Sequence, residues 1–313
     1  MAKSPGVFAV ASGRKIPTVP GLKARIIYNP NSGFLSRHPA LLARVQSYIA
    51  ARRPDIAIAA TERRHHATEL AHQARVEGCE LVLAFGGDGT MNEVAQALVG
   101  TETVLGIIPC GSGNGLARHL GIPLSATEAL GLLENGRTRM IDAGYADGRP
   151  FFVISGLGFE AEIARRFNLL TRRGLPGYMA TGARGWWSYR PQSYVIVQDG
   201  ARQTREVFTL AVANSSQYGN NARIAPRASV EDGLLDLTAV PPVNLFNGPP
   251  LLAHLFAGTL DRRTDVLQLR SSRFTVERNA PGPIHTDGEV HEAGASVDYT
   301  LRPSCLRVLV PAT

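Results

Sequence analysis

The sequence has no uninterrupted apolar run that approaches the roughly 18 residues of a membrane-spanning helix. Its N-terminal apolar stretch, residues 6–11, is too short for a secretion signal and is closed by Arg14 and Lys15. Cysteine is scarce, and three residues at unrelated spacings indicate neither a disulfide framework nor a zinc site. These absences predict a protein of the reducing cytoplasm, which would meet membranes only at their surface.

Lysine never directly follows glycine, which excludes a Walker-type phosphate loop. Acidic residues are absent from residues 163–198. This second absence matters for residues 151–161, which read as a strand followed by Gly-x-Gly-x-x-Ala, the fingerprint of dinucleotide sites. That fingerprint requires an acidic residue about 20 positions later to hold a ribose. Because none is present, we interpret Gly156 and Gly158 as part of a cleft wall.

The acid-free stretch of residues 163–198 is rich in arginine and holds both tryptophans of the chain. Its arginine and tryptophan residues are Arg165, Arg166, Arg172, Arg173, Arg184, Arg190, Trp186 and Trp187. Arginines interleaved with aromatic side chains are typical of surfaces that bind anionic lipid headgroups, so we predict transient membrane contact here. Nucleic acid would suit the same charge, but no recognition motif accompanies it. A solvated helix with its aromatic side in the core is the structural alternative.

Composition and patterning predict a compact protein of two domains. A hydrophobic fraction of 44% with only 19% charged residues suffices for substantial cores in 313 residues. Residues 1–21 are predicted to be a flexible tail, and residues 22–143 alternate apolar strands with helical patterns, as in a parallel sheet covered by helices. Residues 144–313 show short strand patterns separated by turn residues, which predicts an antiparallel β-sandwich. The C-terminal segment can belong to either domain.

Three predicted strands of the N-terminal half each end in a turn of small residues. The three turns are residues 29–33, residues 86–92 and residues 109–115. In an open parallel sheet such turns meet at the carboxyl edge, where ligands bind. The glycines of the second turn remove Cβ atoms and permit positive φ, and the helix that follows points its first N–H groups toward anions. One such turn could be a simple connection, but three together predict a nucleotide phosphate site.

The order of these motifs resembles that of the diacylglycerol kinase catalytic-domain family, which includes sphingosine kinases and soluble bacterial lipid kinases. The matching pieces are residues 29–33, Thr61, residues 86–93, 109–114, 224–226, 231–236 and 287–289. The resemblance covers nearly the whole chain from residue 24 onward. It implies the same two-domain architecture, a nucleotide site in the cleft between the domains, and an ATP- and Mg²⁺-dependent kinase that phosphorylates a lipid hydroxyl.

By this resemblance, the phosphate turns and their neighbours bind ATP. The implied nucleotide residues are Asn29, Pro30, Asn31, Ser32, Gly33, Thr61, Gly86, Gly87, Asp88, Gly89, Thr90, Met91, Asn92, Ser112 and Asn114. Asp88 would also act through metal-bound water, since Mg²⁺ retains several waters and takes few protein carboxylates. A second Mg²⁺ is implied at Ser229, Asp232 and Leu234, although residues 214–221 lack the Gly-Gly cluster common in relatives.

The resemblance places the general base within Asp287-Gly288-Glu289. Glu289 is the first candidate and Asp287 the second, and Asp88 completes the predicted catalytic set. We expect this tripeptide on a turn between the strands of residues 274–276 and 297–301. A plain β-turn with an exposed glutamate is the structural alternative. His285 lies outside the motif and is interpreted as a surface or supporting residue.

Two other functions stay open from the sequence. An NAD kinase or another kinase with a Gly-Gly-Asp-Gly turn would share the second turn, and a catalytically silent lipid-binding or regulatory protein could use the same fold. The acceptor, diacylglycerol-like or sphingoid, is not fixed, and a helix expected at residues 245–260 is a candidate wall of its groove. The expected partners are a lipid presented at a membrane surface and, by resemblance, a second copy of the chain.

Overall fold

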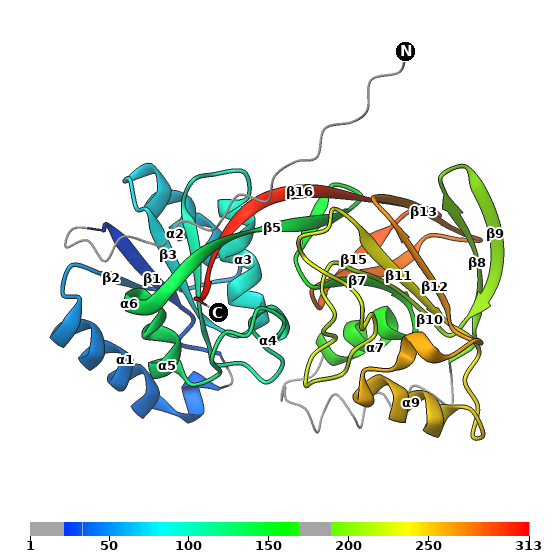
Figure 1. Cartoon of the computed structure of the whole chain (residues 1–313), viewed down its shortest axis with the longest axis horizontal. Helices are drawn as coiled ribbons and strands as arrows, with labels where there is room; N and C mark the ends of the chain where they lie inside the picture. The colour runs from blue at the N-terminus through cyan, green and yellow to red at the C-terminus, as the bar shows by residue number, and fades with distance from the viewer. Residues whose placement is uncertain (1–21, 33, 169–188, 313) are drawn as a thin grey trace, which may run out of the picture.

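The computed structural model describes residues 22–32, 34–168 and 189–312 (Figure 1). The predicted flexible tail, Gly33 of the first turn, and residues 169–188 of the predicted membrane-contact stretch lie outside the described residues. Figure 1 shows two domains side by side, joined across the top by a pair of long strands.

The N-terminal domain is built on four parallel strands in the order β2-β1-β3-β4. They are β1 (Ala24–Tyr28), β2 (Ala57–Ala60), β3 (Leu81–Gly86) and β4 (Val104–Pro109). Every residue of β3 is buried, which explains its continuous apolar sequence, because a central parallel strand is covered on both faces. The parallel pairing of these strands confirms the predicted α/β domain.

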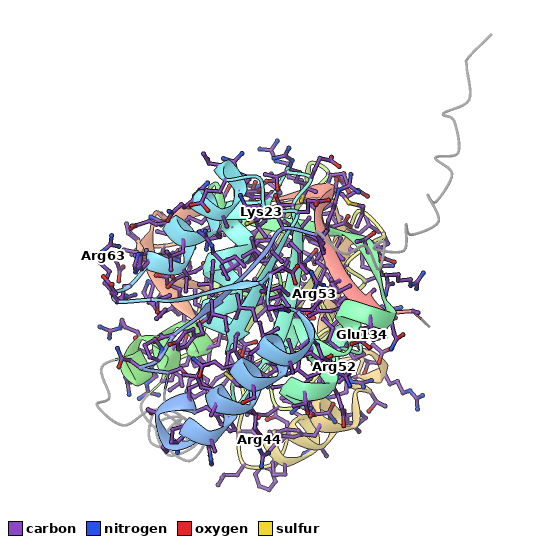
Figure 2. The ribbon with its side chains drawn as sticks, turned by 90° about the vertical axis from the view of Figure 1, so that its left-hand side faces the viewer. Lys23, Arg44, Arg52, Arg53, Arg63 and Glu134 are labelled. Atoms are coloured by element: carbon purple, nitrogen blue, oxygen red, sulfur yellow. The ribbon has the colours of Figure 1, made fainter. Side chains whose placement is uncertain are left out.

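Helices cover both faces of this sheet. Core residues of α1 (Pro39–Arg52) and α5 (Ala126–Leu130) pack on one face, and those of α2 (His66–Val76) and α3 (Asp88–Leu98) pack on the other. The domain is completed by η1 (Leu35–Arg37), α4 (Gly115–His119) and α6 (Leu132–Asn135). On the outer face, Arg52 of α1 contacts Glu134 of α6 at 3.0 Å (Figure 2).

The C-terminal domain is a sandwich of two antiparallel layers, as predicted. One layer has the order β12-β11-β10-β7-β14-β15, and the other continues the first sheet through β13, β8 and β9. Fully buried Phe151, Tyr194, Phe274 and Tyr299 lie in the core between the layers. The strands are β6 (Arg149–Phe151), β7 (Ile154–Gly158), β8 (Gln192–Gln198), β9 (Ala201–Val207), β10 (Thr209–Ala213), β11 (Leu235–Val240), β12 (Leu267–Ser271), β13 (Arg273–Arg278), β14 (Gly282–Thr286) and β15 (Glu289–Ala293).

Helices of the C-terminal domain lie below the sandwich in Figure 1. They are α7 (Phe159–Asn168), α9 (Gly248–Ala257) and the short η2 (Leu260–Arg262). The helix expected at residues 245–260 is therefore shorter than predicted. It begins at Gly248, directly before Pro249 and Pro250, and ends where Gly258 adopts a left-handed φ of 66°.

Two long strands run through both domains. β5 (Gly136–Ala146) and β16 (Ser296–Pro311) pair antiparallel from Tyr299 opposite Ala146 to Pro311 opposite Gly136. The first part of β16 also pairs with β13 in the sandwich, and its last part pairs in parallel with β4. The predicted domain boundary at residue 143 lies inside β5, so the chain passes between the domains within a strand (Figure 1).

Candidate active site

The ends of β3 and β4 bring two of the predicted phosphate turns into direct backbone contact. A Cβ on Gly111 would lie 2.7 Å from Gly87 Cα, and a Cβ on Gly87 would lie 3.2 Å from Gly111 Cα. The positive φ expected in the second turn is not found at Gly86, Gly87 or Gly89. These glycines serve close approach of the backbones, and the two turns form one surface beside the start of α3.

Asp88 holds the two turns together. Its carboxylate oxygens accept the N–H groups of Asn114 at 2.9 Å and Gly115 at 2.7 Å. Asn114 adopts a left-handed φ of 52°, and its side chain bonds both the N–H and the C=O of Gly111, at 3.0 and 2.8 Å. Asp88 is therefore a clamp that shapes the β4–α4 turn.

Each Asp88 oxygen keeps a lone pair after these bonds, because a carboxylate oxygen can accept more than one donor. Among the described residues, no group of three or more His, Cys, Asp or Glu side chains is placed to hold a metal ion. A single carboxylate suits Mg²⁺ that keeps most of its waters. The donor set here fits that form of the ion.

The start of α3 presents free N–H groups to this surface. The first intrahelical bond runs from the Met91 N–H to the Gly87 carbonyl at 3.1 Å, so the N–H groups of residues 88–90 precede it. Such groups favour anions, since the positive end of the helix dipole adds to them. Met91 is buried in the main core cluster and so anchors the first turn of α3.

The remaining predicted nucleotide residues lie at the same carboxyl edge of the sheet. The Asn29 side chain accepts the N–H of Asn31 at 2.9 Å, which shapes the turn after β1. Thr61, which is buried, follows β2, and its N–H donates to the Tyr28 carbonyl at 2.8 Å. Ser112 is exposed in the turn after β4. The structure thus brings the described parts of all three turns to one edge.

Asp287 and Gly288 form the two-residue turn of a hairpin that the sequence analysis missed. β14 ends at Thr286 and β15 begins at Glu289, and these two residues pair directly. Asp287 and Gly288 have φ of 49° and 84°, the positive values that a type I′ turn requires. The expectation of a connection between the strands of residues 274–276 and 297–301 is therefore wrong. The Asp-Gly dipeptide was the available signal.

The hairpin turn is hydrogen-bonded to α3 across 195 residues of sequence. The Asn92 side-chain amide donates to Asp287 Oδ2 at 2.6 Å, and the Gln96 side chain in turn donates to Asn92 Oδ1. The Asp287 carboxylate also accepts the N–H groups of Phe152 at 2.8 Å and of residues 153 and 154 at 2.9 Å each. Burial raises the pKa of Asp287, and these four donors oppose that effect.

Glu289 faces the N-terminal domain. Its side chain is 31% exposed, and its Oε1 lies 3.3 Å from Arg64 Nη2 and 3.8 Å from His65 Nε2. His65 has a φ of 60°, a left-handed conformation that is uncommon outside glycine and is often found at functional sites. Arg64 and His65 were not identified from the sequence, because only the folded chain brings the β2–α2 turn opposite Asp-Gly-Glu.

Behind the hairpin lies a buried acid that explains the Gly-x-Gly pattern. A Cβ on Gly156 would fall 1.3 Å from Glu160 Oε1, so this glycine leaves space for the Glu160 carboxylate. Glu160 Oε1 lies 3.6 Å from Nε2 of His285, and the Gly288 N–H donates to His285 Nδ1 at 3.3 Å. His285 is thus a buried support of the hairpin turn rather than a surface residue. The Gly-x-Gly pattern of residues 156–158 therefore makes room for Glu160, which lies next to the β14–β15 hairpin turn.

His119 at the end of α4 links the phosphate turns to residues 214–221 and predicts a pH dependence. Its Nδ1 accepts the N–H of Ser216 at 3.2 Å, and burial lowers the pKa of His119 to about 4 from 6.5. The unfolded chain therefore binds this proton at a higher pH than the folded chain. We expect the free energy of unfolding to fall by about 3 kcal/mol as the pH drops from 6.5 to 4.

Urea unfolding of the wild type and of His119→Gln between pH 4 and 7 measures this contribution. The variant should lose the part of the pH slope that His119 supplies, because glutamine does not titrate. Identical slopes in the two proteins would show that His119 is not held in its neutral form.

The predicted second Mg²⁺ site contains an arginine. Arg270 forms an ion pair with Asp232, whose Oδ1 accepts the Leu234 N–H at 3.1 Å. The Ser229 hydroxyl accepts a backbone N–H two residues further on, at 3.3 Å. Arg270 thus supplies positive charge beside Asp232, and a metal at this place stays a prediction.

The described part of the acid-free stretch also has local partners. Arg165 and Arg166 of α7 pair with Glu162 at 2.9 and 2.6 Å, directly before the stretch begins. Arg172, Arg173, Arg184, Trp186 and Trp187 lie outside the described residues. Membrane contact by residues 163–198 stays a prediction. In the part of the chain that the structure describes, no helix has the length and apolar character to cross a bilayer.

Comparisons with known proteins agree with the two-domain arrangement. Residues 23–146 match the diacylglycerol kinase catalytic domain, and residues 153–310 match the YegS C-terminal NAD kinase beta sandwich-like domain. A diacylglycerol kinase of Bacillus subtilis is 31% identical, over 85% of this chain and 89% of its own length. A Pseudomonas aeruginosa protein named "Probable lipid kinase YegS-like" is 30% identical, over 86% of this chain and 90% of its own.

The fold is also similar to that of a solved structure. A diacylglycerol kinase from Bacillus anthracis superposes with a TM-score of 0.70 at 20% identity, covering 93% of this chain and 97% of that one. An α/β domain with converging glycine-rich turns, followed by this sandwich, defines the class of diacylglycerol kinase-like and NAD kinase-like folds. Within that class, the chain belongs to the diacylglycerol kinase catalytic-domain family, which confirms the resemblance of its motifs.

Proposed function

We propose that this protein is a lipid kinase that transfers the γ-phosphoryl group of ATP to a hydroxyl of a diacylglycerol-like or sphingoid lipid, with Mg²⁺. The observation that carries the proposal is the 2.6 Å hydrogen bond between Asn92 and Asp287. It holds the helix of the phosphate turns and the Asp-Gly-Glu hairpin in a single site, although they lie on different domains. A phosphate site and a carboxylate at one place are what phosphoryl transfer to a hydroxyl requires.

The phosphates of ATP are assigned to the edge formed by the three turns. The N–H groups of residues 88–90 and the exposed hydroxyl of Ser112 are the donors that suit anionic oxygens there. Mg²⁺, when bound, would neutralise charge on the phosphate oxygens, and Asp88 is the carboxylate placed to hold it through water. The clamp by Asp88 fixes the turn against which the phosphates rest.

Glu289 is assigned the role of general base. The acceptor oxygen forms a bond to the γ-phosphorus, the bond from that phosphorus to its bridging oxygen breaks, and ADP leaves. The hydroxyl proton passes to the Glu289 carboxylate, which is partly exposed and can reach a substrate. Asp287 is assigned a positioning role, because its oxygens already accept four hydrogen bonds and its side chain is half-buried.

The names of the relatives support the lipid acceptor. Both the Bacillus subtilis and the Pseudomonas aeruginosa proteins carry the names of lipid-directed kinases. We therefore place the reaction in the cytoplasm, at a membrane surface that presents the lipid. An NAD kinase and a silent lipid-binding protein are the competing functions, and the assay below separates all three.

The test is transfer of radiolabelled γ-phosphate from ATP with Mg²⁺ to a panel of lipids in mixed micelles, run with wild type and Asp88→Asn. We expect a labelled lipid, and a loss of at least about 100-fold in the variant, because an amide would turn an N–H donor toward the N–H of Asn114 or Gly115. Asp55→Asn is the control, since Asp55 is exposed and forms its ion pair with nearby Arg53. Labelled NAD⁺, or ATP binding without any product, would overturn the proposal.

A further inference from the structure

The segment of residues 241–260 has no charged residue, although 19% of the chain is charged. It begins after β11, contains α9, and ends before Asp261. A surface helix of a globular protein normally carries charges on its solvent face. This segment therefore has the composition of a buried helix.

The segment is nevertheless exposed. Leu251 is buried and Leu255 packs against the main core, but the adjacent side of α9 presents Leu252 at 55% and Phe256 at 52% exposure. Immediately before the helix, Leu245 is 64% and Phe246 is 91% exposed. We name these four exposed residues, Leu245, Phe246, Leu252 and Phe256, the α9 apolar surface. Among the described residues, they are most of the large hydrophobic side chains classed as exposed.

Two arginines stand beside this surface. The Arg223 N–H donates to the Leu255 carbonyl at 2.9 Å, and a Cβ on Gly258 would lie 2.9 Å from Arg223 Cδ, so its side chain lies at the C-terminal end of α9. Arg262 is exposed in η2, directly after. No ion pair is found for either arginine with any acid that the structure describes. The α9 apolar surface is thus bordered by uncompensated positive charge.

This combination favours a bilayer over a second copy of the chain. In a symmetric dimer each copy would bring its own Arg223 and Arg262 to the interface, and residues 241–260 of the other copy carry no acid that would pair with them. Anionic headgroups instead complement arginines that flank a row of apolar side chains. α9 has ten residues, a length suited to lying in the interface and too short to span it.

We propose that the α9 apolar surface docks onto a bilayer containing anionic lipid. Phe246, Leu252 and Phe256 enter the boundary between headgroups and acyl chains, while Arg223 and Arg262 contact the headgroups. The inference rests on the proposed function, which requires the enzyme to meet its lipid acceptor at a membrane. α7, which contains Glu160, lies on the same lower side of the C-terminal domain as α9 (Figure 1).

Sedimentation with large unilamellar vesicles tests the docking surface without any catalytic step. Vesicles of phosphatidylcholine alone and of phosphatidylcholine with phosphatidylglycerol are compared for the wild type, Leu252→Asp/Phe256→Asp and Arg223→Gln/Arg262→Gln. We expect the first variant to lose at least tenfold in vesicle partitioning and the second to lose its preference for phosphatidylglycerol. Val76→Asp, which changes a 79% exposed residue at the end of α2, should bind as the wild type does.

Unchanged sedimentation of Leu252→Asp/Phe256→Asp would overturn the docking surface. The proposal would also be overturned if light scattering showed that the wild type is a dimer, that this variant is a monomer, and that the variant still binds vesicles. In that case α9 would be an interface between two copies of the chain. Kinase activity separates the two proposals. The Arg223→Gln/Arg262→Gln variant should phosphorylate a dispersed short-chain acceptor as the wild type does and lose activity only on acceptor carried by vesicles that contain phosphatidylglycerol. If the protein bound vesicles through α9 but phosphorylated no lipid, the proposed function would be contradicted and the docking surface would still be supported.

Discussion

Glu289→Gln is expected to lower kcat for lipid phosphorylation by about 10²–10⁴-fold, with little change in the KM for ATP or in stability. Glutamine keeps the size of the side chain but cannot take the proton of the acceptor hydroxyl. The residue is partly exposed and its two neighbours, Arg64 and His65, are mostly exposed, so the fold does not depend on its charge. Initial rates at saturating ATP, with the lipid concentration varied, give kcat and KM separately.

Glu292→Gln provides the matched control. Glu292 lies on the same strand, β15, and is exposed. It should keep the wild-type kcat, because it does not face the β2–α2 turn. If Glu289→Gln kept a kcat within a few-fold of wild type, Glu289 would not be the base, and the proton acceptor would have to be sought elsewhere in the site.

Asp287→Ala is expected to destabilise the protein by about 3–5 kcal/mol as well as to abolish activity. The change leaves four buried N–H donors without an acceptor, three from the backbone of residues 152–154 and one from Asn92. It also removes the hydrogen bond that joins the two domains at the site. Unfolding in urea, followed by circular dichroism, measures the loss of stability.

A second Asp-Gly hairpin turn in the same protein supplies the comparison. Asp199 and Gly200 have φ of 49° and 83°, close to the values at Asp287 and Gly288, but both are exposed. Asp199→Ala should therefore cost far less than Asp287→Ala. Equal losses would mean that turn geometry, rather than the satisfied carboxylate, sets the stability effect. Activity that survives in Asp287→Ala would contradict its positioning role.

The α/β domain could be predicted from the sequence because its strands are continuously apolar. β3 is buried at every residue, and its glycine-rich turn follows directly. The β14–β15 hairpin was missed because its sequence is largely polar, with His285 and Glu292 among the strand residues. The length of β16 was missed because Arg302, Pro303 and Ser304 interrupt its apolar pattern, where the pairing with β5 shifts register.

The motifs of the site could be predicted from the sequence, but the different roles of the residues within them could not. Asp287 and Glu289 are neighbours in one tripeptide, and nothing local distinguishes them. The difference arises from residues 152–154, which lead into β7 and whose N–H groups bind Asp287, and from the β2–α2 turn, which contacts Glu289. Glu160 and His285 were equally hidden, because their pairing needs the space that Gly156 leaves.

The strand β16 has a consequence for how the chain is made. Residues 22–146 leave the ribosome long before β16, and until then β4 and β5 each lack one of the strands with which they pair in the finished sheet. A newly synthesised N-terminal half therefore carries open strand edges, which are templates for wrong pairing. The sheet of the N-terminal domain is therefore complete only when β16 has been made. Nascent chains cut short before residue 296 should depend on chaperones and be removed by proteases rather than accumulate.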